Sequence, residues 1–262
     1  MLSEKTLEQE MEKQRMLENR KEELEREVTQ RTEEVVAQKL KIDKQHDELK
    51  HEKKKSDDLL LNILPEEIAE ELKQKGYSDA RYYDHVTVMF TDFADFTKAA
   101  ERMTPKELVD ELHTCFKAFD DIITAAGIEK IKTIGDAYLA VCGFSATDKE
   151  HAEKMVVAAM KIVEFIRKRK ARLGENAFNI RVGIHSGSVV AGIVGIKKFA
   201  YDVWGDTVNT AARLEQHGEV GRINISQQTY ELISSHFDCT YRGEIEAKNK
   251  GGLKMYFVDK VK

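Results

Sequence analysis

Two aspartates, Asp92 and Asp136, each stand where an apolar run of the sequence ends. Asp92 closes the strand-like run "VTVMFTD", and Asp136 follows Gly135 at the turn of "KIKTIGDAYLA". If the two strands are neighbours, both carboxylates reach one sheet edge, where without a basic partner they repel each other and one pKa rises. A divalent cation removes that repulsion, and two carboxylates beside phosphate oxygens suit magnesium better than zinc. The pair therefore predicts a magnesium-type site, although either aspartate alone is an ordinary turn residue.

Groups suited to phosphate follow the first aspartate and recur further along the chain. The segment "FADFT" supplies backbone amides around Phe96 and the Thr97 hydroxyl at the start of an expected helix, where anions bind. Arg181 opens the apolar run "RVGIHSG" and either holds phosphate or caps a sheet edge. Asn209 and Arg213 lie four residues apart and share one helix face, which is either part of a site or an exposed surface.

Two charges, Lys132 and Asp202, interrupt runs that are otherwise apolar. An isolated buried charge is costly, so these side chains are expected either to pair with each other or to bind a ligand. Lys248 and Lys250, in "KNKGG", form a basic loop whose simplest interpretation is a solvated turn. Burial therefore points to a specific partner for Lys132 and Asp202, but not for the two loop lysines.

The composition describes a protein of 262 residues with 34% charged residues and a formal net charge of -5. That balance gives no indication of a nucleic-acid-binding surface. Three cysteines, Cys115, Cys142 and Cys239, lie far apart without CxxC spacing, which predicts reduced thiols and not a disulfide framework or zinc site. No apolar run reaches the roughly 18 residues of a membrane span, and the charged N-terminus is unlike a signal peptide. We expect a cytoplasmic chain.

Residues 1–59 contain neither Gly nor Pro and are rich in Glu, Lys, Gln and Arg. Such a charge run is either a solvated tail or a helix with a partner. Apolar residues hold five of eight a positions of a heptad and three of eight d positions. The β-branched Val28, Val35 and Ile42 at a favour a parallel two-stranded coiled coil. Residues 60–77 follow as a short helical adaptor, and a parallel coil would bring two copies of the next domain together.

Residues 78–262 have the mixed composition of a globular domain. The expected order strand–helix–strand–strand–helix–strand, with helices on one face, predicts an α+β fold, a ferredoxin-like α/β sandwich. A Ser-Gly pair is expected to form a turn between two strands within 179–195. The expected elements are a strand in 84–96, a helix in 104–127, a hairpin in 128–144, a helix in 149–174, two strands in 179–195, a strand and helix in 199–218, a strand and helix in 222–237, and a strand in 253–261.

Four segments together resemble the signature segments of one family, the class III nucleotidyl cyclase catalytic domain. They are "FTDFADFT", "KIKTIGDAYLA", "RVGIHSG" and "YDVWGDTVNTAARLE", and they occur in the family's order and spacing between about Asp84 and Val261. The adaptor resembles the transducing element of receptor-type cyclases, and the coil resembles their signalling helix. The resemblance implies an enzyme in which the ribose 3′-hydroxyl attacks the α-phosphorus and pyrophosphate leaves.

The resemblance also implies a role for each candidate residue. Asp92 and Asp136, with the backbone of Phe93, match the positions that bind two Mg²⁺ or Mn²⁺ ions. Asn209 and Arg213 match the pair that orients the ribose and stabilises charge on the transferred phosphoryl group. The positions that match phosphate-binding groups are Phe96, Thr97, Arg181 and one of Lys248 or Lys250.

In that family Lys132 and Asp202 match the residues that read the base. Lysine donates to adenine N1 and aspartate accepts from the N6 amino group, whereas guanylate cyclases typically carry Glu and Cys there. The resemblance therefore favours ATP over GTP and formation of 3′,5′-cyclic AMP. It also implies a homodimer, because in the family the metal-binding aspartates of one subunit meet the base- and ribose-binding residues of the other.

Three alternatives are weighed against this interpretation. A guanylate cyclase differs only in its base and needs an assay with both nucleotides. A non-catalytic coiled-coil module would lack at least one of Asp92, Asp136, Asn209 or Arg213, and all four are present. A diguanylate cyclase would carry a GGDEF-like segment, which does not occur. A sensor upstream of the coil is expected, in a cytoplasmic protein or in the cytoplasmic portion of a membrane receptor.

Overall fold

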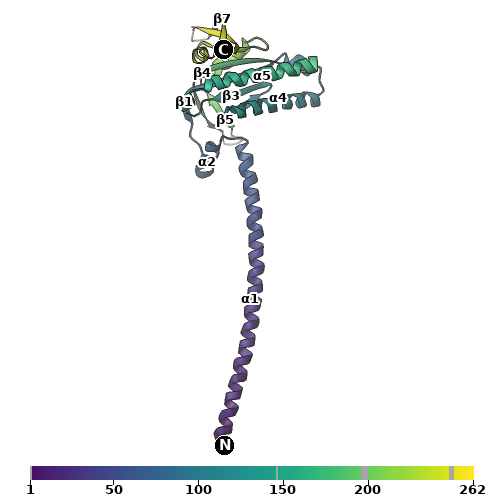
Figure 1. Ribbon diagram of the computed structural model, residues 1–262, viewed down its shortest axis with the longest axis vertical. Helices are drawn as coiled ribbons and strands as arrows, with labels where there is room; N and C mark the ends of the chain where they lie inside the picture. Colours follow the sequence, from purple (N-terminus) through teal and green to yellow (C-terminus); the bar gives the residue numbers. More distant parts are fainter. Residues whose placement is uncertain (1, 146, 196–199, 248–250) are drawn as a thin grey trace. The chain divides into compact units, whose positions relative to one another are not determined.

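The computed structural model describes residues 2–145, 147–195, 200–247 and 251–262, which divide into two units, residues 1–69 and 70–262 (Figure 1). The first unit consists mainly of one helix, α1, Leu2–Leu61. The next helix, α2, Glu66–Lys75, contains the point of division. No helix in the described part of the chain is long and apolar enough to cross a membrane.

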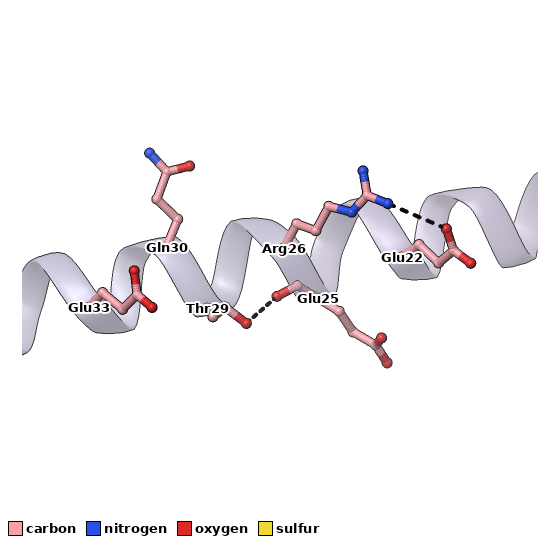
Figure 2. A pocket seen from close by; sticks show the side chains of 6 residues that line it. All are labelled: Glu22, Glu25, Arg26, Thr29, Gln30 and Glu33. Atoms are coloured by element: carbon pink, nitrogen blue, oxygen red, sulfur yellow. Dashed lines mark hydrogen bonds and ion pairs between the residues drawn. The ribbon is translucent and has the colours of Figure 1, made fainter.

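Helix α1 presents its apolar side chains to solvent. Val28, Val35 and Ile42 are each 62% exposed, as is expected of the seam of a coiled coil seen without its partner. Figure 2 shows six polar side chains that line one pocket and that all come from this single helix, so this pocket is an open surface and not an enclosed cavity. The long helix is confirmed, and the coiled coil itself stays a prediction.

The second unit is built on one large sheet with the strand order β2-β3-β1-β4-β6-β8-β7, to which β5 adds by pairing with β4. The strands are β1 Arg81–Ala94, β2 Glu129–Ile134, β3 Ala137–Cys142, β4 Asn179–Val194, β5 Ala200–Trp204, β6 Ile223–Ser226, β7 Phe237–Ala247 and β8 Gly251–Val261. The helices are α3 Phe96–Ala100, α4 Pro105–Ala125, α5 His151–Leu173, α6 Asp206–Gln216 and α7 Gln227–Ile233, with a 3-10 turn at Gly174–Asn176.

The chain order β1-α4-β2-β3-α5-β4 with the spatial order β2-β3-β1-β4 confirms the expected ferredoxin-like core. Helix α4 starts where the sequence predicts it, because Thr104 caps it and Glu107 completes a capping box. Helix α5 ends at Gly174, which has a positive φ of 60°. The three cysteines are free thiols, as predicted.

The two faces of the sheet are covered by different helices. Met89 and Ile184 enter the main apolar cluster, which also contains buried side chains of α4 and α5. Gly183 alternates with Ile184 and faces the other way, where a Cβ would lie 2.1 Å from the Glu215 nitrogen of α6. The two helices of the expected core, α4 and α5, therefore share one face, as predicted, and α6, which follows that core in the chain, packs on the opposite face.

Two strand predictions need correction. β4 is one strand of 16 residues and not two, because Ser186 and Gly187 pair with Thr87 and Val86 of β1 instead of turning. Gly187 serves the close approach of α6, since a Cβ there would meet the Thr207 hydroxyl at 2.6 Å. Strand β7, "FDCTYRGEIEA", was not expected; it is an edge strand whose charged side chains hide the pattern of a buried strand.

Candidate active site

Asp92 and Asp136 come together because β1 and β3 are neighbouring strands. Thr91 pairs with Tyr138, so the end of β1 meets the β2–β3 turn that carries Asp136. Burial raises the pKa of Asp92 to about 6, helped by the negative charge of Asp136 and a hydrogen bond between the two carboxyl groups. The predicted convergence and its electrostatic signature are both confirmed.

The expectation that this pair has no basic partner is wrong. Arg181 is the cross-strand partner of Asp92, and its Nη2 donates to Asp92 Oδ2 at 3.1 Å. Its Nε donates to Glu215 Oε1 at 2.8 Å. β4 lies inside the sheet between β1 and β6, which excludes a sheet-edge cap as the role of Arg181. The guanidinium lowers the pKa of Asp92, but less than burial and Asp136 raise it.

Glu215 belongs to this cluster and was missed by sequence reasoning. It lies on α6, two residues after Arg213, and is 5% exposed. Burial raises its pKa, while the hydrogen bond and charge of Arg181 oppose that rise. The signal in the sequence was the last letter of "NTAARLE", a glutamate at the end of an amphipathic helix. Glu215 fixes the direction of Arg181 and ties α6 to the aspartate pair.

The donor set fits a divalent cation held jointly with a substrate. Among the described residues no group of three or more His, Cys, Asp or Glu forms that could hold a metal ion, so Asp92 and Asp136 supply an incomplete shell. Mg²⁺ accepts such a shell, since it is usually held by one or two carboxylates with water and substrate phosphates. Burial, and after it the negative charge of Asp136, raises the pKa of Asp92, and a bound cation would favour the ionised carboxylates.

The segment after Asp92 turns sharply. The side chain of Phe93 is 2% exposed and stacks on Phe178 at 4.6 Å, so only its backbone remains for a ligand. Asp95 adopts a left-handed φ of 55°, and α3 begins at Phe96. Thr97 is exposed on the first turn of α3. This placement leaves the proposed phosphate contacts of Phe96 and Thr97 as predictions.

Lys132 and Asp202 form a direct ion pair, 70 residues apart in the chain. Lys132 Nζ donates to Asp202 Oδ2 at 2.5 Å, and Asp202 Oδ1 accepts from the backbone nitrogen of Val203 at 2.9 Å. Their side chains are 39% and 19% exposed, so a ligand can reach both. The expectation of a mutual pair is confirmed, and the pair joins β2 to β5.

Asn209 and Arg213 lie on α6. In the part of the chain that the structure describes, neither side chain makes a hydrogen bond or ion pair. Their helix is held firmly, because Gly183 admits its backbone and Asn224 Nδ2 donates to the Leu214 carbonyl at 2.7 Å. They are thus fixed in place with free polar groups, as ligand-binding residues need. Lys248 and Lys250 lie outside the described residues.

Comparisons with known proteins show the family of this chain. The family model of the adenylate and guanylate cyclase catalytic domain matches residues 78–260. The chain is 38% identical over 211 residues to atrial natriuretic peptide receptor 2 of Anguilla japonica, covering 79% of this chain and 20% of that protein. It is 37% identical over 205 residues to an adenylate cyclase of Mycobacterium bovis, covering 78% of this chain and 46% of that protein. The chain thus spans between a fifth and a half of these relatives.

Two solved structures extend the comparison. The guanylate cyclase domain of a Catenaria anguillulae protein in complex with GTP superposes with a TM-score of 0.66 at 37% identity, over 70% of this chain and 100% of that chain. The adenylyl cyclase CyaB of P. aeruginosa superposes with a TM-score of 0.65 at 27% identity, over 70% of this chain and 97% of that chain. The chain therefore belongs to the family of class III adenylate and guanylate cyclase catalytic domains.

Proposed function

We propose that this chain is an adenylate cyclase that converts ATP to 3′,5′-cyclic AMP and pyrophosphate. The observation that carries the choice of ATP is the Lys132–Asp202 pair, which places an ammonium donor and a carboxylate acceptor side by side. Adenine offers an acceptor at N1 and a donor at N6. Lys132 can therefore donate to N1, and Asp202 can accept from N6, in place of their contact with each other. Guanine offers a donor at N1 and an acceptor at O6, so it places a donor against Lys132 and an acceptor against Asp202 and hydrogen-bonds with neither.

The remaining residues divide the reaction between them. Asp92 and Asp136, with the Phe93 backbone, would hold two divalent cations, which when bound favour ionisation of the ribose 3′-hydroxyl and neutralise the triphosphate. Arg181 and the start of α3 hold phosphate oxygens. Asn209 orients the ribose, and Arg213 stabilises the charge that grows on the transferred phosphoryl group. The side chains of Asn209, which is exposed, and Arg213, which is partly buried, have no hydrogen-bond or ion-pair partner among the described residues, and this supports these roles.

We further propose that the active form is a homodimer with composite sites. The metal-binding aspartates of one subunit would meet Lys132, Asp202, Asn209 and Arg213 of the other. The exposed apolar seam of α1 supports this, because a partner helix in a coiled coil would cover Val28, Val35 and Ile42. A sensor upstream of the coil, in a receptor-type protein with this domain in the cytoplasm, would give the coil its signal. Receptor-type guanylate cyclases among the relatives support that arrangement.

Guanylate cyclase activity is the second candidate, because a receptor-type guanylate cyclase of Caenorhabditis elegans is as similar to this chain, at 38% identity, as an adenylate cyclase is at 37%. A joint substitution of Lys132→Glu and Asp202→Cys tests the choice. We expect it to move the preference from ATP towards GTP, measured as the ratio of kcat/KM for the two nucleotides with Mn²⁺. An unchanged ratio would contradict the assignment of these residues to the base.

A further inference from the structure

Strand β2 contains a register shift immediately before Lys132. Lys130 pairs with Ala140 of β3, but Lys132 pairs with Leu139, so β2 has one residue more than β3 over this step. Cross-strand partners share a sheet face, and Ala140 and Leu139 point to opposite faces. Lys130 and Lys132, which in a regular strand share a face, therefore point to opposite faces. Such bulges re-aim side chains near functional sites.

The contacts of the two lysines confirm their opposite directions. Lys130 Nζ lies 2.8 Å from Asp120 Oδ1 of α4, on the face covered by α4 and α5. Lys132 Nζ instead meets Asp202 of β5. Without the bulge, Lys132 would point towards the helices and away from the base-reading position. The direction of Lys132 thus depends on whatever holds the register of β2.

One carboxylate holds both strands of this hairpin. Asp120 accepts a 2.6 Å hydrogen bond from the hydroxyl of Tyr138 on β3 and the ion pair from Lys130 on β2. The Tyr138 residue is fully buried, and the Lys130 ammonium lies 5.1 Å from the centre of its ring. Lys130 precedes Lys132 by two residues, and Tyr138 follows Asp136 by two residues. Asp120 touches neither Lys132 nor Asp136, so it acts only through the hairpin.

We propose that Asp120 is a positioning residue for nucleotide selection, which fixes the bulge and so directs Lys132 at the base. This inference rests on the proposed role of Lys132 in reading the base. Loss of the Asp120 carboxylate leaves the buried Tyr138 hydroxyl without its acceptor and frees Lys130, so β2 can relax towards regular pairing. Asp136 sits in the tight turn and shifts less than Lys132 does, so selection suffers before metal binding.

The test measures selection separately from chemistry. The full chain and its Asp120→Ala variant are titrated calorimetrically with 3′-deoxy-ATP and 3′-deoxy-GTP, which lack the attacking hydroxyl, and assayed with ATP and GTP. We expect the ATP-over-GTP ratio to fall about 10- to 100-fold in both measurements, as for a misplaced contact group. Lys130→Met keeps the Tyr138 hydrogen bond and should lower the ratio less. The two substitutions combined should be less than additive, because they act through one contact.

The matched control is Asp121→Ala, which removes the neighbouring exposed carboxylate of α4 and should leave the ratio unchanged. Lys132→Met separates the two claims. If Lys132→Met lowers the ratio and Asp120→Ala does not, the positioning role is wrong and the proposed function stands. If Lys132→Met leaves the ratio unchanged, base reading by Lys132 is wrong, and the positioning role falls with it. If the Asp120→Ala protein does not fold, Lys130→Met tests the positioning role instead: a lower ATP-over-GTP ratio supports it, and an unchanged ratio contradicts it.

Discussion

The crowded carboxylates make a prediction that runs against the usual effect of an active-site substitution. In the metal-free protein, Asp136→Asn should stabilise the catalytic unit at pH 8. Asp92 has a pKa of about 6, against an ordinary value of 3.8, a rise of about two units. Each unit corresponds to about 1.4 kcal/mol, so the strain at pH 8 is about 3 kcal/mol. Burial, the largest cause, remains in the variant, and the expected gain is therefore about 1–2 kcal/mol.

The pH dependence follows from the direction of the shift. A carboxyl group whose pKa is higher in the folded state binds its proton more tightly there. Its contribution to the free energy of unfolding is fully present below the unfolded pKa of 3.8 and is lost as the pH rises through about 6. The wild-type protein has lost it at pH 8 and retains about half of it at pH 5. The advantage of Asp136→Asn should therefore shrink as the pH falls from 8 to 5.

Trp204 is the single tryptophan and lies in the catalytic unit, so its fluorescence reports urea unfolding there without the signal of α1. The measurement compares wild type, Asp136→Asn and the exposed control Asp121→Asn in EDTA at both pH values. Saturating Mn²⁺ should reverse the order, because it stabilises the intact aspartate pair by mass action. An Asp136→Asn protein that is no more stable than wild type in EDTA at pH 8, or that gains as much from Mn²⁺, would refute the reasoning.

Three further predictions test the elements around the site. Gly183→Ala should cost about 1–3 kcal/mol in unfolding free energy and lower kcat, because its Cβ would press α6 away at Glu215; an unchanged urea midpoint would contradict the packing. Val35→Asp should weaken dimerisation in sedimentation equilibrium and reduce activity at low protein concentration, and a full-strength dimer would count against the coil. Inactive Asp92→Ala and inactive Arg213→Ala proteins, mixed so that heterodimers form, should recover part of the activity; no recovery would exclude composite sites.

Much of the core could be predicted because its signals are local. Alternating apolar residues, the Thr104 cap and the Gly174 stop locate the strands and helices, and strand adjacency in the sheet brings Asp92 to Asp136. Gly187 was misread as a turn because a glycine that admits a neighbouring helix looks the same in sequence as one that bends the chain. Its actual role depends on α6, which begins about 20 residues later in the chain and packs on the sheet face opposite to α4 and α5.

The parts of the site that escaped prediction all depend on contacts distant in sequence. Arg181 meets Asp92 through strand pairing, and Glu215 reaches Arg181 from a helix that packs on the opposite face. The bulge before Lys132 changes which face that residue occupies, although no Gly or Pro marks it. Residue types therefore indicated the chemistry, while register and helix placement decided which groups touch.

Turnover of the two nucleotides by the unmodified chain tests the central claim most directly. The purified protein, with Mn²⁺ and ATP and GTP present together at equal concentration, is assayed for both cyclic nucleotides and for pyrophosphate. We expect cyclic AMP as the main product, with one pyrophosphate for each cyclic nucleotide. Predominant cyclic GMP, or no cyclic nucleotide from a protein shown to be a dimer with bound Mn²⁺, would contradict it.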